Sequence, residues 1–262
     1  MSTVSLIVST YNWKEALALC LASIRGQSER PLEVLVADDG SDRETGDVVV
    51  RAAMSFSIPV RHVWQRDVGF RAARIRNIAM ARARGDYLIH VDGDSILHRH
   101  FVRDYHQAAE SGCFVRGQRV FLPAAATERL LWSPTARPSW RTRGLRKRYA
   151  AFRLPWLTRF LLDWRPGDVR GHNLACWRSD AIAVNGYDER MVGWGREDDE
   201  FAQRLLNAGL RKRRLRFSGI VYHLHHEPRP RPEQGSNDEI LRASQATGIV
   251  RCELGLEQHL DS

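Results

Sequence analysis

The first hundred residues alternate short apolar runs with amphipathic segments, and this alternation constrains the fold more than any other feature of the chain. The apolar runs are rich in β-branched residues and have the length of buried strands. Strands are predicted over Val4–Ser9, Leu32–Ala37, Val60–Trp64 and Tyr87–Val91. Such alternation is typical of a parallel, doubly wound α/β sheet, in which ligands bind outside the carboxyl ends of the strands.

The segments between and after these strands carry helix signals. Helices are predicted over Glu15–Arg25, with Asn12 as a candidate N-cap, and over Ala72–Arg84, which Gly85 ends. In the second half, the pattern predicts strands over Asn173–Trp177, Arg214–Phe217 and Ile220–Leu224, and helices ending at Leu206 and spanning Asn237–Ala246. A length of 262 residues fits one large α/β domain, or one domain with a small appendage.

Composition narrows the class of protein. A net charge of +9 indicates an anionic partner, which could be a nucleotide, a nucleic acid or an acidic membrane surface; a basic surface that only aids solubility is the alternative. The four cysteines form no CxxC pair, which favours a reducing compartment over a zinc or disulfide framework. Because we find neither a secretory signal nor an apolar run of roughly 18–20 residues, we expect a cytoplasmic protein.

Polar residues follow three of the predicted strands, at the edge where their carboxyl ends meet. These residues are Thr10, Tyr11 and Asn12 after the first strand, Asp38-Asp39-Gly40-Ser41 after the second, and Asp92-Gly93-Asp94 after the fourth. Two carboxylates around a glycine can hold Mg²⁺ or Mn²⁺, which would neutralise charge on a leaving diphosphate. A carboxylate such as Asp39 can accept the imide hydrogen of uracil. Strand-end turns and a helix N-cap are the purely structural alternatives.

An acidic cluster begins the helix that is predicted to end at Leu206. The segment reads Gly193-Trp194-Gly195-Arg196-Glu197-Asp198-Asp199. Carboxylates at a helix start are favoured by the helix dipole, which is a structural explanation. It does not explain a Trp between two glycines, which offers a flat apolar face beside carboxylates. A sugar needs such a combination, and one carboxylate could act as general base on an attacking hydroxyl.

Two further groups suggest metal and phosphate binding. In His223-Leu224-His225-His226, strand alternation places His223 and His225 on one face, where they could complete a metal site with Asp94, and makes His226 the least suitable ligand. A chance histidine cluster is the alternative. Arg71, Arg74, Arg76 and Asn77 form a basic helix face that could recognise phosphate or simply be solvated.

The stretch from Arg129 to Arg170 mixes Arg and Lys with four tryptophans, at positions 132, 140, 156 and 164. Aromatic and cationic side chains together could lie on an anionic bilayer, form a lid over a bound ligand or contact nucleic acid. An ordinary packed subdomain is the alternative.

Jointly, these residues resemble family 2 glycosyltransferases with the GT-A fold. The resemblance is carried by Val4–Asn12, Val36–Ser41, Arg76-Asn77 and Asp92-Gly93-Asp94. The second half, from Asn185 to Asp199, is similar to the carboxyl-terminal region of β1,4-galactosyltransferases and bacterial chondroitin polymerases. The similarity covers roughly residues 3–122 and 170–228. The chain departs from the family pattern at two places. Arg196 stands where the galactosyltransferases usually have glycine, and the basic, Trp-rich insert from about Ala124 to Asp168 has no counterpart. The identity of the donor sugar therefore cannot be inferred from the resemblance.

The resemblance implies one Rossmann-like, mostly parallel GT-A domain over residues 1–262, with a smaller acceptor-binding carboxyl-terminal portion. Its parts would be a nucleotide-sugar-binding half (1–122), a basic Trp-rich insert (123–169), an acceptor and catalytic half (170–228) and a tail (229–262). Asp198 would be the catalytic base beside Glu197, and Asp94 would bind Mn²⁺ or Mg²⁺ with His223 or His225. The substrate-binding residues would be Thr10, Tyr11, Asn12, Asp39, Arg71, Arg76, Asn77, Asp92, Asn173, Trp194, Gly195 and Asp199.

We therefore expect an inverting, metal-dependent transferase that moves a hexose or N-acetylhexosamine from a UDP-sugar to a hydroxyl of a cell-surface glycan, such as lipopolysaccharide or capsule. The acceptor would be a glycan or a lipid-linked glycan, with peripheral contact to an anionic membrane and no nucleic acid. A binding module for nucleic acid or membranes on a degenerate transferase fold is the alternative. A metal-dependent nucleotidyltransferase is a third candidate, against which stands the lack of a Gly-rich phosphate loop near the amino terminus.

Overall fold

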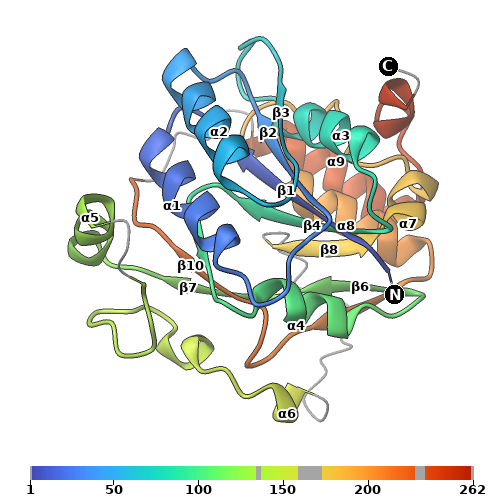
Figure 1. Cartoon of the computed structure of the whole chain (residues 1–262). Helices are drawn as coiled ribbons and strands as arrows, with labels where there is room; N and C mark the ends of the chain where they lie inside the picture. The colour runs from blue at the N-terminus through green and yellow to red at the C-terminus, as the bar shows by residue number, and fades with distance from the viewer. Residues whose placement is uncertain (1, 134–136, 159–172, 228–233, 261–262) are drawn as a thin grey trace.

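The computed structural model describes residues 2–133, 137–158, 173–227 and 234–260. Within them, seven strands form the larger sheet and three form a smaller one (Figure 1). The larger sheet contains β1 (Val4–Thr10), β2 (Glu33–Asp38), β3 (Val60–Trp64), β4 (Tyr87–Asp92), β6 (Cys113–Arg116), β8 (Leu174–Trp177) and β9 (Arg211–Arg214). The smaller sheet contains β5 (Ser95–Leu97), β7 (Gln118–Phe121) and β10 (Ile220–His223).

The larger sheet has the strand order β3-β2-β1-β4-β8-β6-β9. The first four strands in this order are parallel, and β6 pairs with β9 in parallel. Only β8 among these strands runs against its neighbours, β4 and β6. The predicted mostly parallel α/β sheet is confirmed, and β8 brings a segment from the second half of the chain into its middle.

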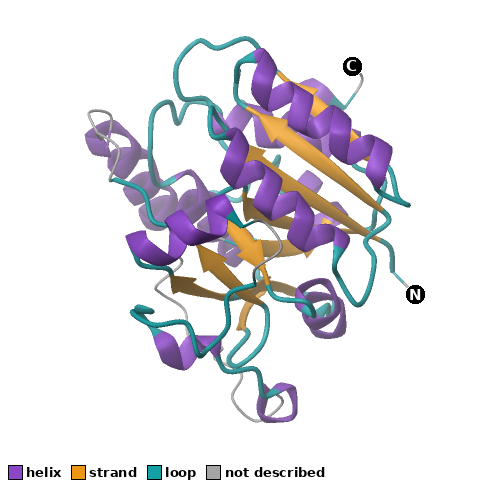
Figure 2. Cartoon of the chain, turned by 60° about the vertical axis from the view of Figure 1, so that its left-hand side comes forward, coloured by secondary structure: helices purple, strands orange, loops and turns teal. Residues whose placement is uncertain are grey.

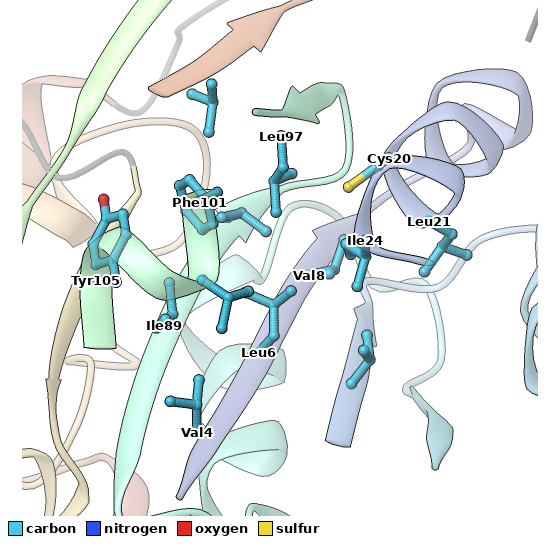
Figure 3. Close-up of a cluster of buried hydrophobic side chains, with 14 of the residues drawn as sticks. Val4, Leu6, Val8, Cys20, Leu21, Ile24, Ile89, Leu97, Phe101 and Tyr105 are labelled. Carbon is cyan, nitrogen blue, oxygen red and sulfur yellow. The ribbon is translucent and has the colours of Figure 1, made fainter. Parts of the chain in front are cut away.

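Helices cover both faces of this sheet (Figure 2). One face packs against α1 (Lys14–Arg25), α2 (Arg43–Ser55) and α4 (Phe101–Ala108), and the other against α3 (Ala72–Arg82), α7 (Arg178–Ala183) and α8 (Glu197–Asn207). Side-chain alternation along β1 serves both layers, because Leu6 and Val8 lie in the first core while Ile7 lies in the second. Figure 3 shows the first of these cores, in which β1 meets α1 and α4.

A third core joins the insert to the smaller sheet. It packs Val120, Tyr222 and Leu224 against α5 (Ala124–Trp132) and the 3₁₀ turn Arg148–Ala151. Phe121 and Arg146 form an antiparallel β-bridge beside it. The segment that contains Arg146 and the 3₁₀ turn is therefore fixed along β7, at one edge of the smaller sheet, and α6 (Pro155–Thr158) follows it. Residues 134–136 and 159–169 of the predicted insert, including Trp164, lie outside the described residues.

Three local predictions are wrong. Trp13, not Asn12, precedes α1, and the Asn12 side chain instead accepts a hydrogen bond from the Asp42 main chain. α3 ends at Arg82 rather than Arg84, and Gly85 serves close packing, since a Cβ there would lie 2.5 Å from the main-chain N of Ser5. The strand expected at 214–217 lies at Arg211–Arg214, because its pairing partner β6 fixes the register.

Candidate active site

A cleft of about 1400 Å³ opens at the carboxyl ends of β1 and β4, where a doubly wound sheet places its ligands. It is bounded by both sheets, by the start of α8 and by part of the insert. The predicted site residues that line it are Thr10, Tyr11, Asn12, Asp39, Arg76, Asp92, Asp94, Trp194, Gly195, Glu197, Asp198, Asp199, His223 and His225. Segments more than 200 residues apart in the sequence thus meet in one cavity.

Asp39 lies almost buried at one end of the cleft. One of its carboxylate oxygens accepts a hydrogen bond from Gln65 Nε2 (2.5 Å), and the other accepts from the main-chain N–H of Arg71 (2.8 Å). A carboxylate offers about four lone-pair sites, so these two bonds fix its orientation and leave capacity for a ligand N–H. Burial raises the pKa of Asp39, and the two hydrogen bonds oppose that rise.

Gly93 allows β4 to end directly against β1. Its main-chain N donates to Ser9 O (2.7 Å), and a Cβ at position 93 would lie 2.9 Å from that oxygen. Only glycine fits this close approach without displacing the backbone. The flanking carboxylates then diverge: Asp92 pairs with Arg119 and Arg76, and Asp94 turns toward β10.

Asp94 lies within a group of three metal-ligating side chains. Its Oδ2 is 3.3 Å from His223 Nε2 and 3.5 Å from His226 Nε2, and the three ligand atoms lie within 4.8 Å of one another. Burial alone would raise the pKa of Asp94, but the hydrogen bond and charge of His223 hold it below its usual range. Neighbouring ligands around an octahedral ion with 2.0–2.1 Å bonds are about 3 Å apart, so this group fits a divalent cation.

The histidine assignment from strand alternation is wrong in one position. β10 ends at His223, and beyond it the chain leaves the strand, so the two-residue period no longer applies. His226 therefore reaches Asp94, whereas His225 lies outside the ligand group and its main-chain N donates to Thr127 Oγ1. The rings of Trp13 and His226 pack at nearly a right angle, and the rings of Phe121 and His223 are tilted against each other.

The carboxylates at the start of α8 share one buried arginine. Arg76 Nη1 lies 3.0 Å from Glu197 Oε1 and 3.3 Å from Asp198 Oδ1, and its Nη2 lies 3.7 Å from Asp92 Oδ1. Burial raises the pKa of Asp198 to about 8; Arg76 opposes this rise, while the nearby Glu197 and Asp92 add to it. The Asp198 side chain is still 21% exposed, so it can reach a group bound in the cleft.

Three predicted substrate-binding residues do not line the cleft. Arg71 contributes its main-chain N–H to Asp39. Asn77 is buried and bonds Tyr187 through both its amide nitrogen and its oxygen, which ties α3 to the second half of the chain. Asn173 is buried with its amide nitrogen near Gln118 O and Gly219 O (3.3 and 3.4 Å). Buried amides that bond main-chain groups hold a scaffold rather than a substrate, so the structure places Asn77 and Asn173 in the scaffold beside the cleft.

Sequence reasoning missed much of the basic wall of the cleft. The additional basic lining residues are Arg116, Arg119, Arg146, Lys147, Arg196 and Arg214. The charge run of the insert could have suggested Arg146 and Lys147, which lie over the ring of Phe121. Arg119 bonds Asp92 from a strand of the smaller sheet, and no local pattern marks that pairing.

Comparison with known proteins adds the family. The profile of glycosyl transferase family 2 matches residues 5–155, which is more than half of the chain, and that of the N-terminal domain of galactosyltransferase matches residues 165–227. Chondroitin synthase of Escherichia coli is 25% identical over 239 residues, covering 84% of this chain and 34% of the synthase. Validoxylamine A glucosyltransferase of Streptomyces hygroscopicus subsp. limoneus is 26% identical, covering 79% and 48%.

Solved structures agree with the fold. The structure of S. aureus TarS residues 1–349 in complex with UDP-GlcNAc superposes with a TM-score of 0.65 at 16% identity, covering 98% of this chain and 69% of that one. At this identity the likeness establishes the GT-A fold alone. The chain spans about a third to a half of the length of the two curated relatives above. With its profile match over residues 5–155 and its GT-A sheet, this chain belongs to glycosyl transferase family 2.

Proposed function

We propose that this chain is an inverting, metal-dependent glycosyltransferase that moves a hexose or N-acetylhexosamine from a UDP-sugar to a hydroxyl of a cell-surface glycan. The observation that carries the proposal is that one cleft holds a buried carboxylate (Asp39), a metal-ligand group (Asp94, His223 and His226) and a cleft-facing carboxylate of raised pKa (Asp198). TarS was solved with UDP-GlcNAc and with UDP in this fold, which supports the choice of donor.

The donor would lie between Asp39 and the metal-ligand group. Asp39 would accept the imide N–H of uracil with its fixed carboxylate, and Thr10 and Tyr11 would line the nucleoside. Asp94, His223 and His226 would hold the cation; a mixed set of carboxylate and imidazole donors favours Mn²⁺ over Mg²⁺, which prefers oxygen alone. The bound ion would supply positive charge to the diphosphate as it leaves.

Asp198 would act as the general base. The acceptor hydroxyl would give its proton to this carboxylate as its oxygen forms a bond to the anomeric carbon. The bond from that carbon to the diphosphate oxygen breaks in the same displacement, so the anomeric centre inverts without a covalent sugar–enzyme intermediate. Arg76 keeps Asp198 and Glu197 oriented toward the cleft, and Trp194 offers its ring face to a sugar.

A nucleotide panel tests the donor site. We expect UDP to raise the melting temperature only when Mn²⁺ is present. At a hundredfold excess of UDP over its Kd, binding should add about 2.7 kcal/mol to the free energy of unfolding. The UDP-sugar that gives the largest further rise identifies the donor class, and GDP and ADP serve as controls. Equal shifts with every nucleotide, or none at all, would contradict the donor assignment. A release of pyrophosphate rather than UDP during turnover would favour a nucleotidyltransferase.

The insert supports contact with an anionic membrane at the cytoplasmic face. Trp132, Tyr149 and Trp156 are 84%, 62% and 64% exposed. The sequence has no acidic residue between Glu128 and Asp163, and Arg146 and Lys147 of the same segment also line the cleft. A lipid-linked acceptor lying in the bilayer would therefore reach the cleft beside the bound surface.

All four cysteines are free and buried, which suits a reducing compartment. Among the described residues, no helix combines the length and the apolar character needed to cross a membrane.

Vesicle binding tests this surface. We expect sedimentation with phosphatidylglycerol vesicles but not with phosphatidylcholine vesicles, and a loss of binding as salt is raised, because the attraction is electrostatic. Trp156→Ala and Arg143→Gln should each weaken binding several-fold, whereas Met54→Ala, an exposed apolar change on α2, should not. Equal binding to both lipids would argue against an anionic membrane as partner.

A further inference from the structure

The loop that carries Trp194 is held by a helix outside both matched family segments. α9 (Gln234–Thr247) follows residue 227, where the second match ends, and packs along α8 (Figure 1). Building on the proposed function, we propose that Asn237 and Asp238 of this helix are positioning residues. They hold the loop 192–196 and, through Arg196, the carboxylate of Asp199, and so they set the acceptor side of the cleft.

Asn237 holds the main chain on either side of Trp194. Its side chain is almost fully buried (1% exposed), and its Nδ2 donates to Val192 O (3.1 Å) and Gly195 O (2.9 Å). In the same loop, the main-chain N of Gly193 donates to Phe70 O (3.0 Å). Leaving a buried amide without hydrogen-bond partners costs free energy, so these bonds stabilise one geometry of the loop. Trp194, which lines the cleft, therefore lies in a loop that is held both by α9 and by the main chain at Phe70.

Asp238 acts through Arg196. Arg196 has a φ of +75°, the left-handed region, which costs a residue with a side chain about 1–2 kcal/mol. Its guanidinium bridges two carboxylates, with Nε 2.5 Å from Asp238 Oδ1 and Nη1 3.1 Å from Asp199 Oδ2. The unusual backbone conformation thus turns the side chain toward α9. Asp199 lines the cleft beside Asp198, so Asp238 fixes the orientation of a cleft carboxylate without touching the cleft itself.

α9 stays in place without these two residues. Ser244 Oγ donates to Glu200 Oε1 (2.8 Å), and Asn207 Nδ2 donates to Ser244 O (2.9 Å), both farther along the helix. Ser244 is buried, and Glu200 is also bonded by Arg204. Removal of the Asn237 or Asp238 side chain should therefore loosen the loop without detaching the helix, and the variants should fold.

The experiment combines kinetics with hydrogen exchange on Asn237→Ala, Asp238→Ala and Asp238→Asn, with Glu239→Gln, an exposed change on the same helix, as control. Transfer is measured from UDP-N-acetylglucosamine and UDP-galactose to a set of p-nitrophenyl monosaccharides. We expect Asn237→Ala to raise the acceptor KM and to lower kcat by about 10²-fold, since a displacement of about 1 Å has that effect. The Mn²⁺-dependent stabilisation by UDP should be unchanged. Asp238→Asn, which keeps a hydrogen-bond acceptor for Arg196, should recover much of the activity lost in Asp238→Ala.

Hydrogen exchange reports on the loop whether or not transfer occurs. We expect amides of residues 192–196 to exchange at least about tenfold faster in Asn237→Ala, with β1 and α3 unchanged. Unchanged exchange in this loop would overturn the inference, and so would faster exchange with wild-type acceptor KM and kcat. A failure of the proposed function looks different, because the wild-type chain itself would then show no stabilisation by UDP and Mn²⁺.

Discussion

Replacing Asp198 with Asn is expected to lower kcat by about 10²–10⁴-fold while leaving UDP binding intact. The change removes a cleft-facing carboxylate whose pKa is raised by burial to about 8, so that it can accept a proton near neutral pH. It also keeps the size of the side chain and an oxygen toward Arg76, which lies 3.3 Å away. The measurement is steady-state transfer, together with the shift in melting temperature caused by UDP and Mn²⁺.

The pH profile provides a second test of the same role. A general base works only when deprotonated, and the pKa of Asp198 is raised to about 8. For the wild-type chain, kcat/KM should therefore fall about tenfold for each pH unit below 8 and level off above it. A profile that is flat from pH 6 to 9 would assign the base to another group.

Asp47→Asn is the matched control, because Asp47 is an exposed carboxylate on α2, away from the cleft. It should keep the wild-type rate and the wild-type pH profile. If Asp198→Asn transfers sugar at a rate close to that of this control, Asp198 is not the base, and Glu197 and Asp199 become the candidates.

Replacing Asp94 with Ala is expected to weaken Mn²⁺ binding by at least about 10²-fold and to remove the Mn²⁺-dependent part of activity. The carboxylate is the only anionic member of the described ligand group, and even residues behind the ligands of a metal site change affinity by about 10–100-fold. Mn²⁺ affinity is measured by calorimetry, so the result does not depend on turnover.

The two neighbouring histidines provide a matched pair for this experiment. His226→Ala should weaken Mn²⁺ binding, because its Nε2 lies 3.5 Å from Asp94 Oδ2. His225→Ala should not, because that side chain lies outside the group, although it is exposed like that of His226. Equal effects of the two changes would place the ion elsewhere, and wild-type affinity in Asp94→Ala would refute the assignment.

The sequence patterns predicted the fold well where an element depends on its own residues. The apolar runs at β1, β2 and β4 are buried on both sides in the sheet, so their composition alone identifies them; β3, the edge strand, is only partly buried but keeps its β-branched pattern. The carboxyl-end rule then placed Asp39, Asp92 and Asp94 in one cleft before any geometry was known. Asp198 and Trp194 line the same cleft. They could be predicted as site residues because an ordinary helix cap does not explain a Trp between two glycines beside three carboxylates.

The remaining features depend on contacts between distant parts of the chain. β9 begins at Arg211, which reads as solvated surface in isolation and becomes a strand only by pairing with β6. His226 reaches Asp94 because β10 ends at His223, a boundary that alternation cannot locate. Asn77 and Asn173 are polar residues near the motifs, but their partners are main-chain groups far away in the sequence. Local patterns carry no information on such partners.

The position of β8 has a consequence for how the protein folds during synthesis. This strand lies between β4 and β6, although it follows β6 by nearly sixty residues in the chain. Until residues 174–177 have left the ribosome, the facing edges of β4 and β6 have no strand to join them, and such edges are prone to pair with other chains. The larger sheet therefore cannot be completed until a distant segment has been synthesised. Such long-range strand pairing gives the fold a high contact order, so we expect slow folding and a need for chaperones during that interval.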